Sequence, residues 1–432
     1  MESRERKAMS HSIGKNYWKT IVFTFCLGWT VIWIYRSMLS PVYPAIQGSI
    51  GEQTKAAMGL ISSCYFFGYT AMQIPSGALV DRFGQKRVLI PGFLIFALGA
   101  FLISRATTLT AIYVGSVMAG VGCGCYYGSA FSLTAEHVPP EKKGLSTAIV
   151  NSGSALGMII GMTLSSYLVN SLGFPWQLMV TISTALILLL VVWYAVALHD
   201  NMADKRKLRS SDAAPDVEAG QDDIVTEVSS ARKEGLWSIR SVACYALYFA
   251  TCYSYYMIVT WLPNFLQTER GIEGGLVGLV VSMISVTAIP GALWFSHLSD
   301  KRRNRKANII LLLEIAAFFL VAVSMLAPNA LVLAAILLLY GLLGKMAVDP
   351  VLISYITDHA EAKNTATTLG TFNFFGMASS VVAPWFTGVI MDMTGSGELG
   401  FYLGAVLLLA GTALFFFTNV VVGERAHRPP SH

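Results

Sequence analysis

Three ionisable side chains lie inside long apolar segments of this chain, namely Arg36, Lys345 and Asp349. A charge at the centre of a bilayer costs about 3 kcal/mol or more, so such residues usually mark a binding site or an ion pathway. A guanidinium presents a planar fork of donors that matches a carboxylate or a phosphate. We therefore expect Arg36 and Lys345 to bind a small anion. The alternative for Arg36 is a structural ion pair across a helix bundle.

Lys345 and Asp349 are four residues apart, which places them on one face of a helix. Gly341 and Gly344 leave room beside them. Arrival of an anion at Lys345 would release Asp349 to take a proton, which makes the pair a candidate coupling switch. The alternative is a self-neutralising pair that only holds the helix. Glu314 is a second candidate for proton coupling, although its position favours pairing with a residue of the eighth helix or a loop.

Polar side chains in the apolar segments could complete a binding site around these cations. The segment 238–266 is dense in tyrosine, and tyrosine hydroxyls can hydrogen-bond a polar ligand. Asn373 places an amide deep in a later apolar segment. The predicted substrate-binding residues are Arg36, Lys345, Asn373, Tyr35, Tyr255, Tyr256 and Tyr127.

The sequence shows no pattern for other kinds of chemistry. No nucleotide-binding loop, metal-ligand cluster or nucleophile–base set is visible, so we expect no enzyme, no ATP-driven step, no cofactor and no metal. Cys123 and Cys125 flank one glycine and are interpreted as small packing residues rather than a metal site. All histidines fall in tails or at helix ends, which excludes a histidine proton relay at the membrane centre.

The elements that must position these residues are membrane helices. The chain has 432 residues, of which 54% are hydrophobic and 13% charged, a balance that excludes a soluble domain. Twelve predicted spans of about 20 or more mostly apolar residues follow one another. They are 18–46, 54–80, 86–105, 109–137, 144–170, 175–199, 238–266, 274–299, 307–327, 329–358, 364–392 and 399–422.

The distribution of Lys and Arg predicts the orientation of these spans. When the N-terminus is placed inside, 25 of the 30 basic residues fall on one side, so both termini are expected in the cytoplasm. The net charge of +5 follows from this rule and does not indicate nucleic-acid binding. A long polar segment interrupts the spans and predicts a cytoplasmic linker. The expected parts are a tail at 1–17, a six-helix bundle at 18–199, the linker at 200–236, a second six-helix bundle at 237–423 and a tail at 424–432.

The two halves carry matching segments at a nearly constant distance. Asp81-Arg82 after the second span and Asp300-Lys301 after the eighth are 219 residues apart. Glu136-His137 and Asp358-His359, after the fourth and tenth spans, are 222 residues apart. Two independent matches indicate an internal duplication. Duplicated halves of a transporter commonly place the substrate site at their interface, near the membrane midplane.

The segment Gly77-Ala-Leu-Val-Asp81-Arg82-Phe-Gly84-Gln-Lys86-Arg87 resembles the signature loop of the major facilitator superfamily, G-x-x-x-D-R-x-G-x-[RK]-[RK]. It lies between the second and third spans, where that family carries it. The resemblance covers about 18–422 and implies an all-α fold of twelve helices in two pseudo-symmetric bundles. It also implies a gating role for Gly77, Asp81, Arg82, Gly84 and Arg87. Gly77 would permit close helix contact and Gly84 a tight turn.

Three further segments resemble the organic anion:cation symporters of that superfamily. They are Tyr35–Gln47, Trp261–Leu266 and the segment from Phe372-Asn373-Phe374 to Gly388. The acid that precedes the first-helix Arg in that group is Tyr35 here, and the acid of its fourth helix is missing from 120–125. Proton coupling in this chain must therefore use another residue or another ion.

These patterns together predict a secondary transporter that imports a small organic anion, of carboxylate or sugar-acid type, with a cation that we expect to be a proton. We expect a monomer in the bacterial inner membrane. The alternative from the same class is an efflux carrier or exchanger of anions or drugs. A sensor without transport activity on the same fold is the alternative from another class, and it predicts ligand binding without flux.

Overall fold

The computed structural model describes residues 17–139, 142–198, 235–272, 274–302, 305–360 and 365–421, with the side chains of 81, 131, 135, 136, 143–145, 365 and 366 left out. The predicted tails and nearly all of the predicted linker lie outside the described residues.

Every regular element in the described residues is a helix. The first half holds α2 (Tyr17–Met38), η1 (Ser40–Val42), α3 (Tyr43–Ile50), α4 (Lys55–Phe83), α5 (Gln85–Ser104), α6 (Leu109–His137), α7 (Lys143–Ser166), η3 (Tyr167–Ser171) and α8 (Trp176–Ala197). The second half holds α10 (Ile239–Thr268), α11 (Leu276–Lys301), α12 (Lys306–Ser324), α13 (Ala330–Leu343), α14 (Lys345–His359), α15 (Thr365–Thr394), α16 (Gly397–Phe415) and η6 (Phe416–Val421).

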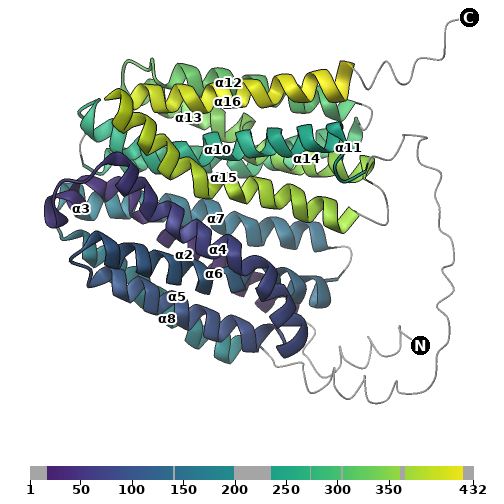
Figure 1. The fold of residues 1–432 in the computed structure, drawn as a ribbon. Helices are drawn as coiled ribbons and strands as arrows, with labels where there is room; N and C mark the ends of the chain where they lie inside the picture. Colours follow the sequence, from purple (N-terminus) through teal and green to yellow (C-terminus); the bar gives the residue numbers. More distant parts are fainter. Residues whose placement is uncertain are drawn as a thin grey trace, which may run out of the picture.

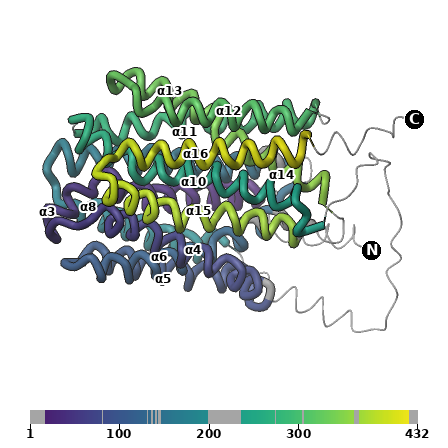
Figure 2. The backbone as a smooth tube through the Cα atoms, turned by 45° about the horizontal axis from the view of Figure 1, so that its top comes forward, coloured from purple at the N-terminus to yellow at the C-terminus, as the bar shows by residue number. Residues whose placement is uncertain are grey.

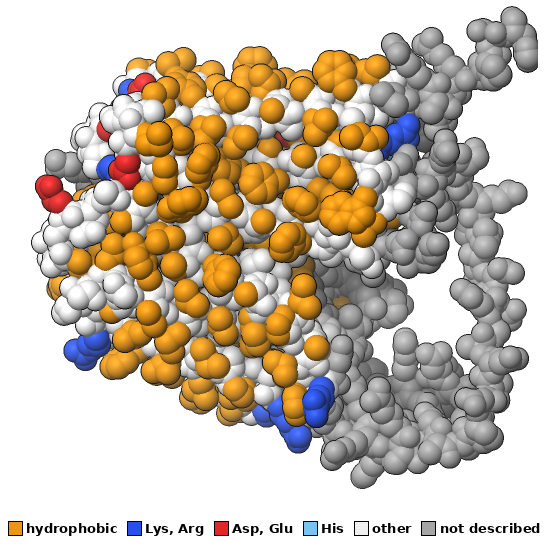
Figure 3. Space-filling view, in the orientation of Figure 1, with side chains coloured by type: hydrophobic (Ala, Val, Ile, Leu, Met, Phe, Trp, Pro, Cys, Tyr) orange, Lys and Arg blue, Asp and Glu red, His pale blue; other side chains and the backbone are white. Residues whose placement is uncertain are grey.

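The predicted membrane helices are confirmed. Eleven helical segments in the described residues are long and apolar enough to cross a membrane, and α4, which is more polar, supplies the twelfth predicted span. Polar residues begin several of them, because a side-chain oxygen at the N-cap accepts from an otherwise unpaired backbone N–H. Thr54, Thr108, Ser238 and Asn329 cap α4, α6, α10 and α13 in this way. Apolar side chains cover most of the face in view, and most of the visible charges lie towards its two ends (Figure 3).

The helices form two bundles that lie side by side (Figure 1). The N-bundle comprises α2 to α8 and the C-bundle comprises α10 to η6, and the helices of both run along one common direction (Figure 2). We call the end at which α2 begins and η6 ends the proximal end, and the opposite end the distal end. The bundles contact each other mainly where α4 packs on α15 and α7 packs on α11.

Two spans that the sequence predicts as continuous are interrupted. The first span breaks at η1, where Pro41 has no N–H to donate. The tenth span breaks at Gly344, whose ψ of −149° is far from helical values, and α14 starts afresh at Lys345. The break therefore places a helix N-terminus inside the tenth span, with Lys345 as its first residue and Asp349 one turn further on.

Candidate functional site

Arg36 lies near the end of α2, surrounded by aromatic rings. Its guanidinium carbon is 4.3 Å from the ring centroid of Tyr69 and 5.3 to 5.5 Å from those of Trp29, Trp33, Tyr65 and Phe66. Such contacts stabilise a cation that has lost part of its water. Trp29 and Trp33 belong to the same helix, whereas the other three rings come from α4.

The polar contacts of Arg36 use only part of its donor capacity. Nε donates to the Tyr65 hydroxyl at 3.0 Å, and Nη2 lies 4.0 Å from the Cys123 sulfur. Within the part of the chain that the structure describes, no carboxylate lies within ion-pair distance of Arg36. The structural ion pair considered above is therefore not formed among these residues. A partly exposed guanidinium without an acidic partner has the charge and the free donors to bind an anion.

Lys345 and Asp349 form the predicted pair. Lys345 Nζ donates to Asp349 Oδ2 at 2.5 Å, with 9% of the lysine and 20% of the aspartate side chain exposed. The ammonium also lies 5.5 Å from the ring centroid of Tyr255 and 5.9 Å from that of Tyr248. Asp349 Oδ1 is buried and has no hydrogen-bond partner within the described chain. The pair is electrically neutral, so Arg36 and the pair together carry one net positive charge.

Two tyrosines of α10 connect the cations of the two bundles. Tyr255 and Tyr256 each lie within electrostatic range of both Arg36 and Lys345. The Tyr256 ring is 4.8 Å from Phe66 of α4 and 5.4 Å from Tyr255, between ring centroids. The structure thus brings together the two cations and both predicted α10 tyrosines at the interface of the bundles.

The other predicted binding residues have different environments. Tyr127 of α6 is 47% exposed and lies within electrostatic range of Lys345 and Asp349, although it belongs to the other bundle. Asn373 is exposed, and its amide donates to Gln73 of α4 at 3.3 Å, across the interface. Tyr35 does not lie at the interface of the bundles. It is buried inside the N-bundle against Phe96, with ring centroids 4.9 Å apart.

The partner of Glu314 differs from the one that its position in the sequence predicts. It is completely buried, and it contacts Thr251 of α10, the seventh span, rather than a residue of the eighth helix or a loop. The expectation of an eighth-helix or loop partner is wrong because α12 lies with this part of its length against the bundle interior. Glu314 is eight residues beyond Lys306, the first residue of α12, and therefore lies about two helical turns inside the helix.

The predicted gating residues lie at the proximal ends of α4 and α5. Gly84 has a φ of +88° and forms the expected tight turn between the two helices. A side chain at Gly77 would have no neighbour within 4 Å, but the Gly77 backbone lies close to α6, since a side chain at Gly128 would be 3.8 Å from Gly77 Cα. Arg82 and Arg87 are exposed, and Arg82 lies over the Phe83 ring. The Asp81 side chain lies outside the described part.

The distal ends of the bundles are held together by a set of hydrogen bonds. The Asp392 carboxylate of α15 accepts from the backbone N–H groups of Lys55 and Ala56, the first residues of α4, at 2.8 Å each. Lys55 Nζ donates to Asn264 of α10 at 2.9 Å. Burial raises the pKa of the neighbouring Glu269 carboxyl, while the Gly397 N–H and the Lys55 ammonium oppose that shift.

Small residues let the backbones approach closely at the same end. A side chain at Gly59 would lie 2.9 Å from the Trp261 ring, and one at Gly278 would lie 2.8 Å from the Ser166 Cβ. Ser166 and Ser171 of the N-bundle also exchange hydrogen bonds of 2.8 Å with the start of α11. The distal end is therefore closed in this structure.

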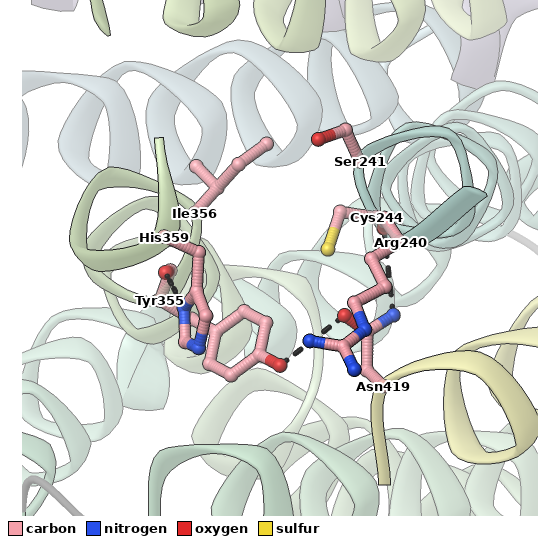
Figure 4. Close-up of a pocket in the computed structure, with 7 residues that line it drawn as sticks. All are labelled: Arg240, Ser241, Cys244, Tyr355, Ile356, His359 and Asn419. Carbon is pink, nitrogen blue, oxygen red and sulfur yellow. Dashed lines mark hydrogen bonds between the residues drawn. The ribbon is translucent and has the colours of Figure 1, made fainter. Parts of the chain in front are cut away.

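A small pocket lies at the proximal end of the C-bundle, away from these residues. Its lining side chains come from the start of α10, the end of α14 and η6 (Figure 4). The Tyr355 hydroxyl lies 3.2 Å from Asn419 Oδ1, and the Asn419 amide donates to the Arg240 carbonyl. These contacts tie three helix ends together. The lining residues are Arg240, Ser241, Cys244, Tyr355, Ile356, His359 and Asn419.

The family sequence model described as Major Facilitator Superfamily matches residues 25–384 of this chain. The chain belongs to this superfamily. A protein named "Probable sulfoacetate transporter" of Cupriavidus necator is 26% identical over 92% of this chain and 93% of its own length. The hexuronate transporter of Bacillus subtilis is 24% identical over 94% and 96%. The superfamily consists of transporters, so the chain is a membrane transporter and no enzyme.

A solved structure supports the fold independently. A bacterial homologue of the human lysosomal transporter Spinster, in an inward-facing and occupied conformation, superposes with a TM-score of 0.77. The match covers 97% of this chain and 100% of the other, at 13% identity. This likeness confirms the predicted superfamily fold of two helical bundles.

Sequence reasoning missed the aromatic surroundings of Arg36. Trp29 and Trp33 precede it by seven and three residues, a spacing that places them on its face of the helix and could have been recognised. Tyr65, Phe66 and Tyr69 come from α4, and no signal in the sequence indicates that this face of α4 meets Arg36.

Proposed function

We propose that this transporter imports a small organic anion together with a proton. Arg36 and Lys345, from opposite bundles, bind the anion, and Asp349 takes up the proton. The observation that carries the proposal is the environment of Arg36. A cation with free donors at the bundle interface, with no acidic partner among the residues that the structure describes, favours binding of an anion.

The ligand chemistry follows from the donors. Arg36 offers a planar fork of N–H groups, and Lys345 offers an ammonium that is paired until an anion competes for it. The aromatic rings around Arg36 remove part of its water, which strengthens each charge-assisted hydrogen bond. Relatives named for sulfoacetate and hexuronate support a carboxylate or sulfonate ligand of a few carbons. Tyr127, Tyr255, Tyr256 and Asn373 would hydrogen-bond the rest of it, whereas buried Tyr35 would support the ring cluster instead.

Coupling follows from the neutral pair in α14. When the anion takes over the Lys345 ammonium, Asp349 loses its partner at 2.5 Å and remains a partly buried carboxylate. Taking up a proton is the least costly way to neutralise it. Anion binding and proton binding would therefore favour each other, as symport requires.

Transport itself requires the two bundles to alternate between opposite openings around the site. The excess of basic residues places the proximal end in the cytoplasm, so the closed distal end would be the outer face. The structure would then represent the state in which the substrate is released inward. Gly77, Asp81, Arg82, Gly84 and Arg87 would close the cytoplasmic side in the opposite state.

A thermal-shift screen of the purified protein tests the ligand class. Ligands that bind the folded state raise the melting temperature by mass action. We expect D-glucuronate or sulfoacetate to stabilise the wild type, neutral D-glucose to have no effect, and Arg36→Ala to abolish the shift. Arg105→Ala, which removes an exposed arginine at the end of α5, is the matched control and should retain the shift. Stabilisation by lipophilic cations alone would overturn the proposal and favour an exporter.

A further inference from the structure

A fully buried carboxyl in the C-bundle has no cationic partner. Glu314 of α12 has an exposed fraction of 0%. Its Oε1 lies 2.5 Å from the Thr251 hydroxyl, and its Oε2 is buried without any hydrogen-bond partner within the described chain. No lysine or arginine of that part of the chain lies within ion-pair distance. An ionised carboxylate in this place would be uncompensated, which is strongly unfavourable.

The hydrogen bonds of Thr251 indicate the protonation state of Glu314. The Thr251 hydroxyl lies 2.9 Å from the Leu247 carbonyl and 2.5 Å from Glu314 Oε1. Both of these oxygens would be acceptors if Glu314 were ionised, but a threonine hydroxyl has one hydrogen to donate. Both contacts are satisfied if Glu314 carries a proton on Oε1. The carboxyl then donates to Thr251, and Thr251 donates to Leu247.

The titratable groups around Glu314 come from the elements packed against α12. Asp349 of α14 lies within electrostatic range of it, and so do Tyr340 of α13 and Cys252 of α10. Lys345 is already paired with Asp349. The ionisable side chains of α16 are Glu398 and Tyr402, both in its distal first turns. Asp349 is therefore the one acid among these neighbours, and its negative charge further disfavours ionisation of Glu314.

We propose that Glu314 is a proton-binding site of the C-bundle and that a proton occupies it in this state. Glu314 and Asp349 differ in access. Glu314 is sealed inside the bundle, whereas 20% of the Asp349 side chain is exposed. Glu314 therefore keeps its proton, whereas Asp349 can exchange one with its surroundings.

The proton on Glu314 Oε1 stays in place when an anion draws the Lys345 ammonium away from Asp349, because an ionised Glu314 would be a buried, uncompensated carboxylate. The proton that Asp349 then takes up comes from water and forms one new O–H bond at Oδ1, while Lys345 stays protonated. The step at Asp349 rests on the proposed function, whereas the protonation of Glu314 does not.

Infrared difference spectroscopy of the purified full-length protein tests the protonation directly, because a neutral carboxyl has a carbonyl stretch distinct from carboxylate bands. We expect the wild type at pH 7 to show a neutral-carboxyl band that Glu314→Gln lacks and Asp349→Asn keeps. Thr251→Ser should leave the band in place, and Thr251→Val should shift its frequency because the hydroxyl acceptor is lost. A wild-type band that survives Glu314→Gln, in protein that remains monodisperse, would overturn the proposal.

A transport measurement tests whether Glu314 keeps its proton during the cycle. In proteoliposomes with D-glucuronate as probe, Glu314→Gln, which mimics the protonated carboxyl, should retain both anion exchange and accumulation driven by a pH gradient. Loss of that accumulation by about tenfold or more would overturn a proton that stays on Glu314. Replacing Na⁺ by choline should change neither result, and stimulation by Na⁺ would contradict proton storage. Absence of any anion flux in the wild type would refute the proposed function. The infrared result would still decide whether Glu314 holds a proton.

Discussion

Removing the Asp392 carboxylate should open the distal end of the transporter. Asp392 accepts two backbone hydrogen bonds of 2.8 Å from the first residues of α4, so it acts as a cap supplied by the opposite bundle. These bonds exist only while the distal end is closed. Their loss therefore shifts the balance between the two openings without touching the anion site.

The magnitude follows from the geometry. Loss of a helix N-cap costs about 1 kcal/mol, and loss of a negative charge at a helix N-terminus adds about 0.3 to 1 kcal/mol. The residue is exposed, so water and salt keep the sum near the low end of about 1 to 2 kcal/mol. Asp392→Ala should thus raise the ratio of distal-open to distal-closed molecules about 5- to 10-fold, since 1.4 kcal/mol is a factor of ten. Asp392→Asn keeps one acceptor oxygen and should have about half the effect in free energy.

The distance between two spin labels, measured by double electron–electron resonance, reports this balance. The labels are attached through Glu52→Cys and Thr394→Cys, which are exposed distal positions in opposite bundles. Asp392→Ala should add a longer distance population. Glu398→Gln is the matched control, because Glu398 pairs with Arg270 inside the same bundle at 3.2 Å. An unchanged distance distribution in Asp392→Ala, or an equal change in Glu398→Gln, would refute the reasoning.

Three further predictions concern the anion site and the interface. Arg36→Lys keeps the charge but loses the planar fork of donors and the hydrogen bond to Tyr65. The anion affinity measured by calorimetry should weaken about 10- to 100-fold, which corresponds to one charge-assisted hydrogen bond of about 1.5 to 3 kcal/mol. An affinity equal to that of the wild type would rule out bidentate binding. Asp349→Asn should retain anion exchange but lose accumulation driven by a pH gradient, because an amide takes up no proton; intact accumulation in vesicles would exclude Asp349 as the exchanging acid. Gly278→Val should increase the longer distal distance population as Asp392→Ala does, because its side chain would meet Ser166 across the closed interface; an unaltered distribution would show that the contact is not needed for closure.

The membrane helices could be predicted from the sequence because hydropathy is a local property. The pair Lys345 and Asp349 could also be predicted, since a spacing of four residues fixes their neighbourhood on a helix. The break at Gly344 was not predicted. Glycines in membrane helices usually serve close packing, and the sequence does not distinguish a packing glycine from one with non-helical dihedral angles.

The rest of the site depends on which helix faces meet. Tyr65 and Tyr69 contact Arg36 because α4, which packs on α6, turns this face towards the end of α2, and no local pattern specifies that orientation. The position of Glu314 in the sequence favours a partner from the eighth helix or a loop, whereas the packing of α12 turns it towards Thr251. Tyr35 was expected at the ligand, and its neighbour Arg36 does face the interface. Adjacent helical residues differ by about 100° in direction, and Tyr35 accordingly packs inside the N-bundle.

The most direct test of anion:proton symport is substrate-induced proton movement in proteoliposomes loaded with a pH-sensitive dye. Addition of D-glucuronate or sulfoacetate should acidify the lumen in wild-type vesicles and leave it unchanged with Arg36→Ala. Acidification that persists in Arg36→Ala, or a response to lipophilic cations alone, would contradict the account.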